Sequence, residues 1–140
     1  MDELRELLRR EYAYKEGINE ALLSFKAERP FKQELEAKKG CFKRLHENLN
    51  GIHNRKTGLI FHSSIENNTQ SGNSHFNLME DSITLMGRIS LITYLHEYAH
   101  ALGFNNELDA RAWSIKLFKK TFPKSFKKLK YVNGMMLKQQ

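Results

Sequence analysis

Two histidines and a glutamate interrupt a mostly apolar segment of this chain at a fixed spacing. The stretch YLHEYAHALGFNNELDARAW, residues 94–113, contains His96, Glu97 and His100. In a helix, residues four apart lie one turn from each other on the same side, so the two histidines can share one tetrahedral ion. Glu97 lies between them in angle and can accept a proton from a water that the ion activates. The H-E-x-x-H pattern therefore predicts two zinc ligands and a general base.

The segment around these residues is expected to form a helix that is buried on most sides. Nearly every residue from 89 to 102 is apolar, and the polar exceptions are Ser90, Thr93, His96, Glu97 and His100. At about 100° per residue these exceptions gather on one narrow side, as they would on the floor of a cleft. The alternative is a core helix with two hydrogen-bonded histidines and a surface glutamate, but burying Glu97 without a functional partner would be costly.

Two histidines leave zinc short of a ligand, because a catalytic site needs three protein ligands and one open position. Gly103 can end the helix, and Asn105 or Asn106 can cap the next one. Glu107 would then lie in the first turn of the second helix, facing back across the bend, and Asp109 is the other candidate ligand. Both acids also suit a helix N-terminus without a metal, through the helix dipole or through a capping box of Asn106 with Asp109.

The first 50 residues are expected to be helical and to support this helix pair. Apolar residues recur at three- and four-residue steps over 2–28, with charges between them, and Gly17 could break or kink that helix. A second helix is predicted over about 31–48, and the turn-forming NLNG at 48–51 should end it.

Residues 58–86 predict a small, mostly antiparallel sheet. GLIFHSSI at 58–65 is short, apolar and flanked by turn residues, as a strand would be, and a polar loop follows over 66–74. Residues 75–86 alternate between apolar and polar on both sides of a central turn, which predicts a hairpin. Together with the metal-binding helix pair at 88–121, these elements predict one α+β domain of 140 residues.

Positive charge is concentrated at the C-terminal end of the chain. The net charge is +7, and residues 110–140 hold nine bases and no acids, eight of the bases being lysines. The basic segment 122–140 is predicted to begin with a short helix at Pro123 and to lose its ordered pattern at Gly134. Basic residues 116–130 could bind nucleic acid or an acidic partner, although a solvated lysine-rich helix face also explains them, and phosphate recognition would favour arginine.

The composition favours a cytoplasmic protein without a membrane segment. No apolar run reaches about 18 residues, and the N-terminal MDELRELLRREY lacks the basic start and apolar run of a signal peptide. The single cysteine, Cys41, cannot form an internal disulfide and is expected to be a buried apolar residue in a reducing compartment.

Residues 74–118 resemble the zincin metallopeptidases. The hairpin HFNLMEDSITLM, the helix ISLITYLHEYAHALG and the segment NELDARAWSIKLF are similar to the edge strand, active-site helix and glutamate helix of gluzincin-like families. Among these, the chain is nearest to the ImmA/IrrE type of phage and mobile-element proteins. A zincin-like fold is therefore expected, with N-terminal helices, a small sheet, a buried active-site helix and a following glutamate helix.

The resemblance implies a role for each of the polar residues. Zn²⁺ would be held by three ligands, namely His96, His100 and Glu107. Glu97 would be the general base, and Asp109 would orient a histidine from outside the ligand set. A peptide substrate would pair with the strand at 75–79, where His75 could stabilise the oxyanion of the transition state or be an ordinary exposed histidine.

These residues predict a zinc metallopeptidase, a hydrolase that cleaves peptide or protein substrates with a zinc-activated water and Glu97 as the base. The alternative is a basic module that binds nucleic acid or protein and carries a structural or vestigial zinc site. A third interpretation is that the protein acts inside a larger assembly, with residues 1–50 as its docking part.

Overall fold

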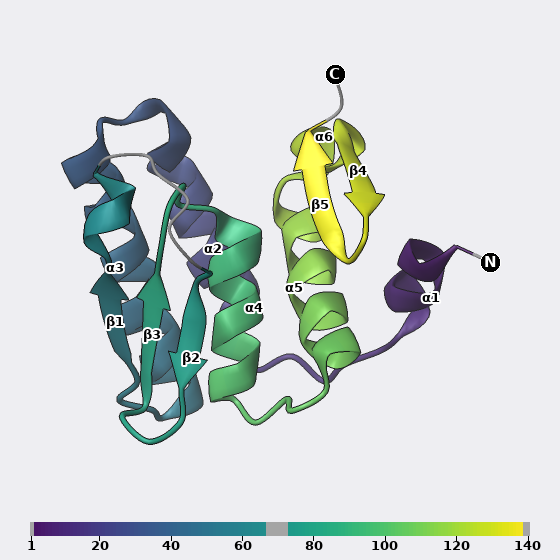
Figure 1. Cartoon of the computed structure of the whole chain (residues 1–140), viewed down its shortest axis with the longest axis horizontal. Helices are drawn as coiled ribbons and strands as arrows, with labels where there is room; N and C mark the ends of the chain where they lie inside the picture. Colours follow the sequence, from purple (N-terminus) through teal and green to yellow (C-terminus); the bar gives the residue numbers. More distant parts are fainter. Residues whose placement is uncertain (1, 67–72, 139–140) are drawn as a thin grey trace.

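A computed structural model describes residues 2–66 and 73–138 of the chain and shows an α+β fold (Figure 1). Its centre is the helix pair α4 (Leu91–Ala101) and α5 (Glu107–Thr121), which lie side by side. One side of α4 contacts a three-stranded sheet, and α5 lies on its other side. None of the helices in the described part has the length and apolar content needed to cross a bilayer.

The N-terminal helix is broken, so the prediction of one helix over 2–28 is wrong. α1 spans Glu3–Arg9 and α2 spans Ile18–Ala27, with no helix between them. Gly17, the expected break, lies at the start of α2 with a left-handed φ of 95°. The segment before it is held against α5 by side-chain bonds, and these bonds favour an extended chain over a helix.

The next helix begins and ends about four or five residues later than the sequence predicts. A 3-10 turn, η1 (Pro30–Lys32), precedes α3, which spans Leu35–His53 and therefore runs through the NLNG at 48–51. The glycine of this motif is exposed, where it costs only about 1 kcal/mol relative to alanine. The amide of Asn50 donates to the carbonyl of Thr57 at 2.9 Å, which ties the end of α3 to the start of the sheet.

The three-stranded sheet is mixed rather than mostly antiparallel. β1 (Gly58–Phe61) pairs in parallel with β3 (Ser82–Leu85), and β2 (His75–Asn77) pairs antiparallel with the other edge of β3. The predicted hairpin is confirmed as β2 and β3. The parallel pair is set by the long connection between β1 and β3, which short-range alternation does not reveal.

The strand predicted at 58–65 is shorter than expected. After β1 the chain enters a 3-10 turn, η2 (Ser63–Ile65), in which the hydroxyl of Ser64 accepts from the N–H of Gly87 at 2.9 Å. The polar loop predicted over 66–74 lies largely outside the described residues.

The bend between α4 and α5 is fixed by two capping arrangements. Gly103 has a left-handed φ of 108°, and its N–H and that of Phe104 donate to the carbonyls of His100 and Ala99 at 3.0 and 3.1 Å. This pair of bonds is a Schellman motif, which favours glycine at the left-handed position. Asn106 caps α5, because its side chain accepts from two N–H groups in the first turn. Both predicted helix boundaries are confirmed.

Residues from both ends of the chain share one core with this helix pair. Apolar side chains of α2, α3, β3, α4 and α5 form a single buried cluster, whose largest members include Phe25, Phe42, Ile83, Tyr94 and Tyr98. Cys41 is buried in the same cluster, as the sequence predicts. α2 and α3 thus pack into the same core as the helix pair, and a docking role for residues 1–50 stays a prediction.

The C-terminal segment forms a hairpin, so the predicted loss of order at Gly134 is wrong. After α6 (Pro123–Lys127), the expected short helix, β4 (Leu129–Val132) and β5 (Met135–Lys138) pair antiparallel. Asn133 and this glycine have φ of 48° and 82°, as in the Asn-Gly turns that favour two-residue hairpins. The hairpin lies over α5 in Figure 1.

Candidate metal centre

The two histidines of α4 and the glutamate at the start of α5 meet at one point. Nε2 of His96 lies 3.2 Å from Nε2 of His100 and 3.2 Å from Oε2 of Glu107, and Nε2 of His100 lies 2.7 Å from Oε1 of Glu107. The three ligand atoms all lie within 4.8 Å of one another, and no fourth Asp, Glu, His or Cys among the described residues joins them. The structure thus brings together the three residues that the sequence predicts as ligands.

The spacing of these atoms suits a tetrahedral zinc ion. With Zn–N bonds of about 2.0–2.1 Å, two ligand atoms of a tetrahedral site lie about 3.3 Å apart. The two Nε2 atoms are 3.2 Å apart, and Oε2 of Glu107 lies 3.2 Å from His96, both close to that edge length, whereas Oε1 lies 2.7 Å from His100 and is closer than the edge. Two imidazoles and one carboxylate are also a donor set that catalytic zinc sites use. The residues therefore fit the ion in both geometry and chemistry.

A hydrogen bond on the far side of its ring orients His100. Nδ1 of His100 lies 2.6 Å from the backbone carbonyl of Phe104. A carbonyl can only accept, so Nδ1 carries the proton, and the lone pair of Nε2 is directed toward the other two ligands. Outer bonds of this kind fix the tautomer and the ring plane of metal-binding histidines. The orienting group belongs to the backbone of the bend, and no side-chain pattern in the sequence indicates it.

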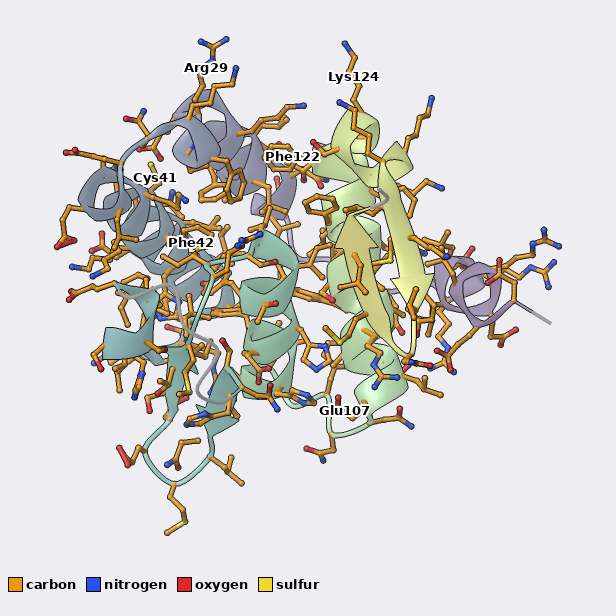
Figure 2. The ribbon with its side chains drawn as sticks, turned by 45° about the horizontal axis from the view of Figure 1, so that its top comes forward. Arg29, Cys41, Phe42, Glu107, Phe122 and Lys124 are labelled. Carbon is orange, nitrogen blue, oxygen red and sulfur yellow. The ribbon has the colours of Figure 1, made fainter. Side chains whose placement is uncertain are left out.

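The site opens to solvent on the side of α5. The side chains of His96 and His100 are each 17% exposed, whereas that of Glu107 is 59% exposed. Figure 2 shows Glu107 at the start of α5, beside the end of α4. A structural zinc site is closed by four protein ligands, but a catalytic one keeps a position for water or substrate. Three ligands and an exposed carboxylate match the catalytic arrangement.

Glu97 is buried between α4 and β2. It is 9% exposed, and the backbone of Phe76 in β2 hydrogen-bonds to its carboxylate. Burial raises the pKa of Glu97 to about 7, and repulsion from Glu107 acts in the same direction. The positive potential of His100 and His75 partly opposes this rise. A carboxyl group with a pKa near neutrality can both accept and return a proton.

The protonation states of the ligands also suit a metal. Burial lowers the pKa of His96, which favours the neutral imidazole, although the carboxylate of Glu107 acts to raise it. Burial alone would raise the pKa of Glu107, but His96, His100 and Arg111 together bring it below its usual value. Neutral imidazole and ionised carboxylate are the forms that bind a metal ion.

Asp109, the other candidate ligand, lies away from the histidines. Its Oδ1 accepts from the hydroxyl of Tyr12 at 2.9 Å and from Nη1 of Arg10 at 2.7 Å. These bonds lower the pKa of Asp109. The prediction that Asp109 binds the metal or orients a histidine is therefore wrong. Its carboxylate instead anchors the chain between α1 and α2 to the first turn of α5.

His75 lies on the edge strand beside the site. It is exposed, and its Nδ1 lies 3.1 Å from the carbonyl of Asn73. It is close enough to the carboxylate of Glu97 to act on its pKa. Its role toward an oxyanion stays a prediction.

Arg111 is a charged neighbour of the site that was not expected from the sequence. It follows Glu107 by one helical turn, and its charge acts to lower the pKa of both Glu107 and His96. Its guanidinium packs against Gly134 in the hairpin turn, where an added Cβ would lie 2.7 Å from Cζ. The i,i+4 spacing from Glu107 is the signal that could have identified it.

A buried histidine supports the middle of α4 from behind. Nε2 of His46 in α3 lies 2.6 Å from the carbonyl of Thr57, and its Nδ1 lies 2.6 Å from the hydroxyl of Tyr94. The carbonyl can only accept, so Nε2 carries the proton and Nδ1 accepts from the tyrosine. Burial lowers the pKa of His46 and thus favours this neutral form.

Comparison of the chain with protein-family models, with curated proteins and with solved structures finds no match.

Proposed function

We propose that this protein is a zinc-dependent peptidase. Three residues would hold the ion, namely His96, His100 and Glu107, and Glu97 would be the general base. The proposal rests on one observation above all: two imidazole nitrogens and a carboxylate oxygen lie within 4.8 Å of one another, beside the buried carboxyl group of Glu97 on the same helix as the two histidines. The hydrogen bond from Nδ1 of His100 to the carbonyl of Phe104 also supports the proposal, because it directs Nε2 of His100 toward His96 and Glu107.

When bound, zinc would supply a Lewis acid that acidifies a water and polarises the substrate carbonyl. Glu97 would accept one proton from the attacking water as the C–O bond forms. It would then donate that proton to the amine nitrogen as the C–N bond breaks, so no other acid or base is needed. Its pKa of about 7 places both steps within reach at neutral pH. Phe104 would keep the Nε2 lone pair of His100 directed into the site throughout.

A peptide substrate suits the strand next to this acid. β2 is an edge strand of the sheet order β1-β3-β2, and its outer edge has no strand partner among the described residues. An extended peptide can add to such an edge through backbone hydrogen bonds. The same strand contacts Glu97 through Phe76, so a peptide bound along β2 would lie near the proposed base.

The test separates metal binding from hydrolysis. Purified wild-type protein and Glu97→Gln are loaded with zinc, their metal content is measured, and both are incubated with a quenched fluorescent peptide library. Glu97→Gln should retain one equivalent of zinc and lose cleavage by at least about a hundredfold, since general base catalysis contributes roughly 10²–10⁴-fold. Cleavage by the variant at the wild-type rate would refute the role of Glu97. Absence of zinc from the wild-type protein would refute the site.

A further inference from the structure

A groove of about 1280 Å³ lies at the end of α4 opposite the metal site. One wall is formed by residues 26–38, the other by residues 118–137, and residues 87–92 close its floor at the start of α4. In Figure 2, Arg29 and Lys124 extend from the helices on the two sides with Phe122 between them, and Glu107 lies at the far end of the molecule. The groove contains none of the proposed metal ligands, so a partner bound in it would not depend on the proposed peptidase activity.

The rim of the groove is basic. Six bases and no acid line it, and the bases are Lys26, Arg29, Lys32, Lys38, Arg88 and Lys128. All but Lys38 are exposed, and none forms an ion pair with any residue in the described part of the chain. Six like charges without counter-charges repel one another, and an anionic partner would relieve that repulsion.

The interior of the groove is apolar. Its apolar members come from both walls and the floor, and they include Phe31, Leu35, Ile92, Phe122, Leu129 and Leu137. Phe31 and Leu137 are 45% and 42% exposed, so apolar surface is available on both walls. Apolar area surrounded by charges of one sign matches an amphipathic partner of the opposite sign.

The aromatic rings of the groove do not favour nucleic acid. Single-stranded nucleic acids stack their bases on free aromatic faces. Here one face of Phe122 is stacked on Phe118 at 5.5 Å, and Nζ of Lys26 lies over the same ring of Phe122 at 5.3 Å, so this ring is already engaged within the protein. Most of the other apolar side chains are aliphatic. The volume of the groove, about 1280 Å³, also exceeds the roughly 300–1,000 Å³ typical of small-ligand pockets, which argues against a small molecule as the occupant.

We propose that this groove binds an acidic amphipathic helix of a partner protein. Apolar side chains at i, i+3, i+4 and i+7 of that helix would enter the groove, as in other helix-in-groove complexes. Its glutamates and aspartates would meet the basic rim. Lys128 is the one lysine of residues 116–130 that lines the groove, so the basic surface involved differs from the one that the sequence suggests.

The test measures binding of a fluorescein-labelled model helix of roughly 20 residues, with leucine at helical spacing and glutamate at most other positions. Anisotropy should show saturation below about 1 mM peptide, and the affinity should fall as salt is added. A peptide with alanine for leucine, and one with lysine for glutamate, should each bind at least about tenfold more weakly. Equal binding of the three peptides, or no binding of the acidic one, would overturn the proposal.

Two pairs of variants place the binding in the groove. Lys32→Glu/Lys128→Glu reverses one exposed charge on each wall and should weaken binding by at least about tenfold, whereas Lys119→Glu/Lys120→Glu reverses two exposed charges outside the groove and should change it less than about twofold. Leu137→Ser should weaken binding more than Met135→Ser, since both lie exposed on β5 but only Leu137 lines the groove. Equal effects within either pair would overturn the assignment. So would tighter binding of oligo-dT or of phosphatidylglycerol vesicles through the same two lysines.

Discussion

The two ends of α4 present opposite kinds of surface. At its C-terminal end, three donor atoms lie within 4.8 Å of one another, beside a bend fixed by backbone hydrogen bonds. At its N-terminal end, a groove of about 1280 Å³ is rimmed by long basic side chains. A metal site needs ligands held in narrow geometry, whereas long charged side chains can adjust to a partner at little cost. One helix thus supports a rigid centre at one end and an adaptable surface at the other.

The largest expected effect is a loss of zinc binding at one end of α4 that leaves peptide binding at the other end unchanged. His100→Ala should lower the zinc content from one equivalent to none, while binding of the acidic helix stays within about twofold of wild type. In the wild type, free zinc at about 1,000 times its Kd should raise the free energy of unfolding by about 4 kcal/mol. Thermal unfolding with and without zinc should show this rise only in the wild type. His75→Ala, which alters a histidine outside the ligand group, is the control and should keep the metal.

The next effect distinguishes two acids of the same helical turn. Glu107→Gln should weaken zinc binding by at least about a hundredfold, because it replaces the charged ligand. Asp109→Asn should leave zinc affinity unchanged and lower the free energy of unfolding by less than about 1 kcal/mol, since its pair with Arg10 is partly exposed. Competition with a chromogenic chelator measures the affinities. Loss of zinc from Asp109→Asn would contradict the assignment of Glu107, rather than Asp109, as the third proposed ligand.

A smaller effect on stability is expected from replacing His46, which hydrogen-bonds to Tyr94 in α4 between the metal site and the groove. His46→Phe leaves the hydroxyl of Tyr94 buried without its partner and should lower the free energy of unfolding by about 2 kcal/mol. The double variant His46→Phe/Tyr94→Phe should recover part of that loss, because both polar groups are then gone. Urea unfolding in a chelator measures both. A double variant that is less stable than the single one would contradict this account of the contact.

The lowered pKa of His46 also predicts how the free energy of unfolding depends on pH. Because burial lowers the pKa of His46, the unfolded chain binds more protons than the folded one below the usual histidine pKa of 6.5. Stability is therefore fully present above pH 6.5 and falls as the pH drops toward the folded pKa. His53 and His96 are shifted in the same direction and add to this trend. His46→Phe should thus show a shallower fall between pH 7 and 5 than the wild type.

The smallest effect concerns the hairpin that walls the groove. Gly134→Ala should lower the free energy of unfolding by about 1 kcal/mol, because φ is +82°, a left-handed conformation that is strained for residues with a Cβ. Gly51→Ala is the matched control, since nothing lies within 4 Å of a Cβ at that exposed helical position. It should stabilise the protein by up to about 1 kcal/mol. Equal shifts in melting temperature would contradict the assigned turn geometry.

The metal end could be predicted from the sequence because its determinants are local. The two histidines share a helix face through their spacing, Gly103 ends that helix, and Asn106 starts the next one. The position of Glu107 is set by these boundaries. The partners of Asp109 could not be predicted in this way, because Arg10 and Tyr12, which bond to it, lie almost 100 residues away in the sequence.

The groove end could not be predicted in the same way because it is built from distant segments. Its walls join residues 26–38 to residues 118–137, and no local periodicity relates them. The same limit explains the parallel pairing of β1 with β3 and the continuation of α3 through a turn-forming motif. The C-terminal hairpin is different, because its Asn-Gly pair is a local signal that the lysine-rich composition conceals.

The bend at Gly103 has a consequence for the order of folding. All three proposed ligands lie within residues 96–107, so the loops that must close to bring them together are short. Short-range contacts form early during folding, whereas the groove requires segments from both ends of the chain. Closing these short loops therefore costs less chain entropy than joining the two walls of the groove.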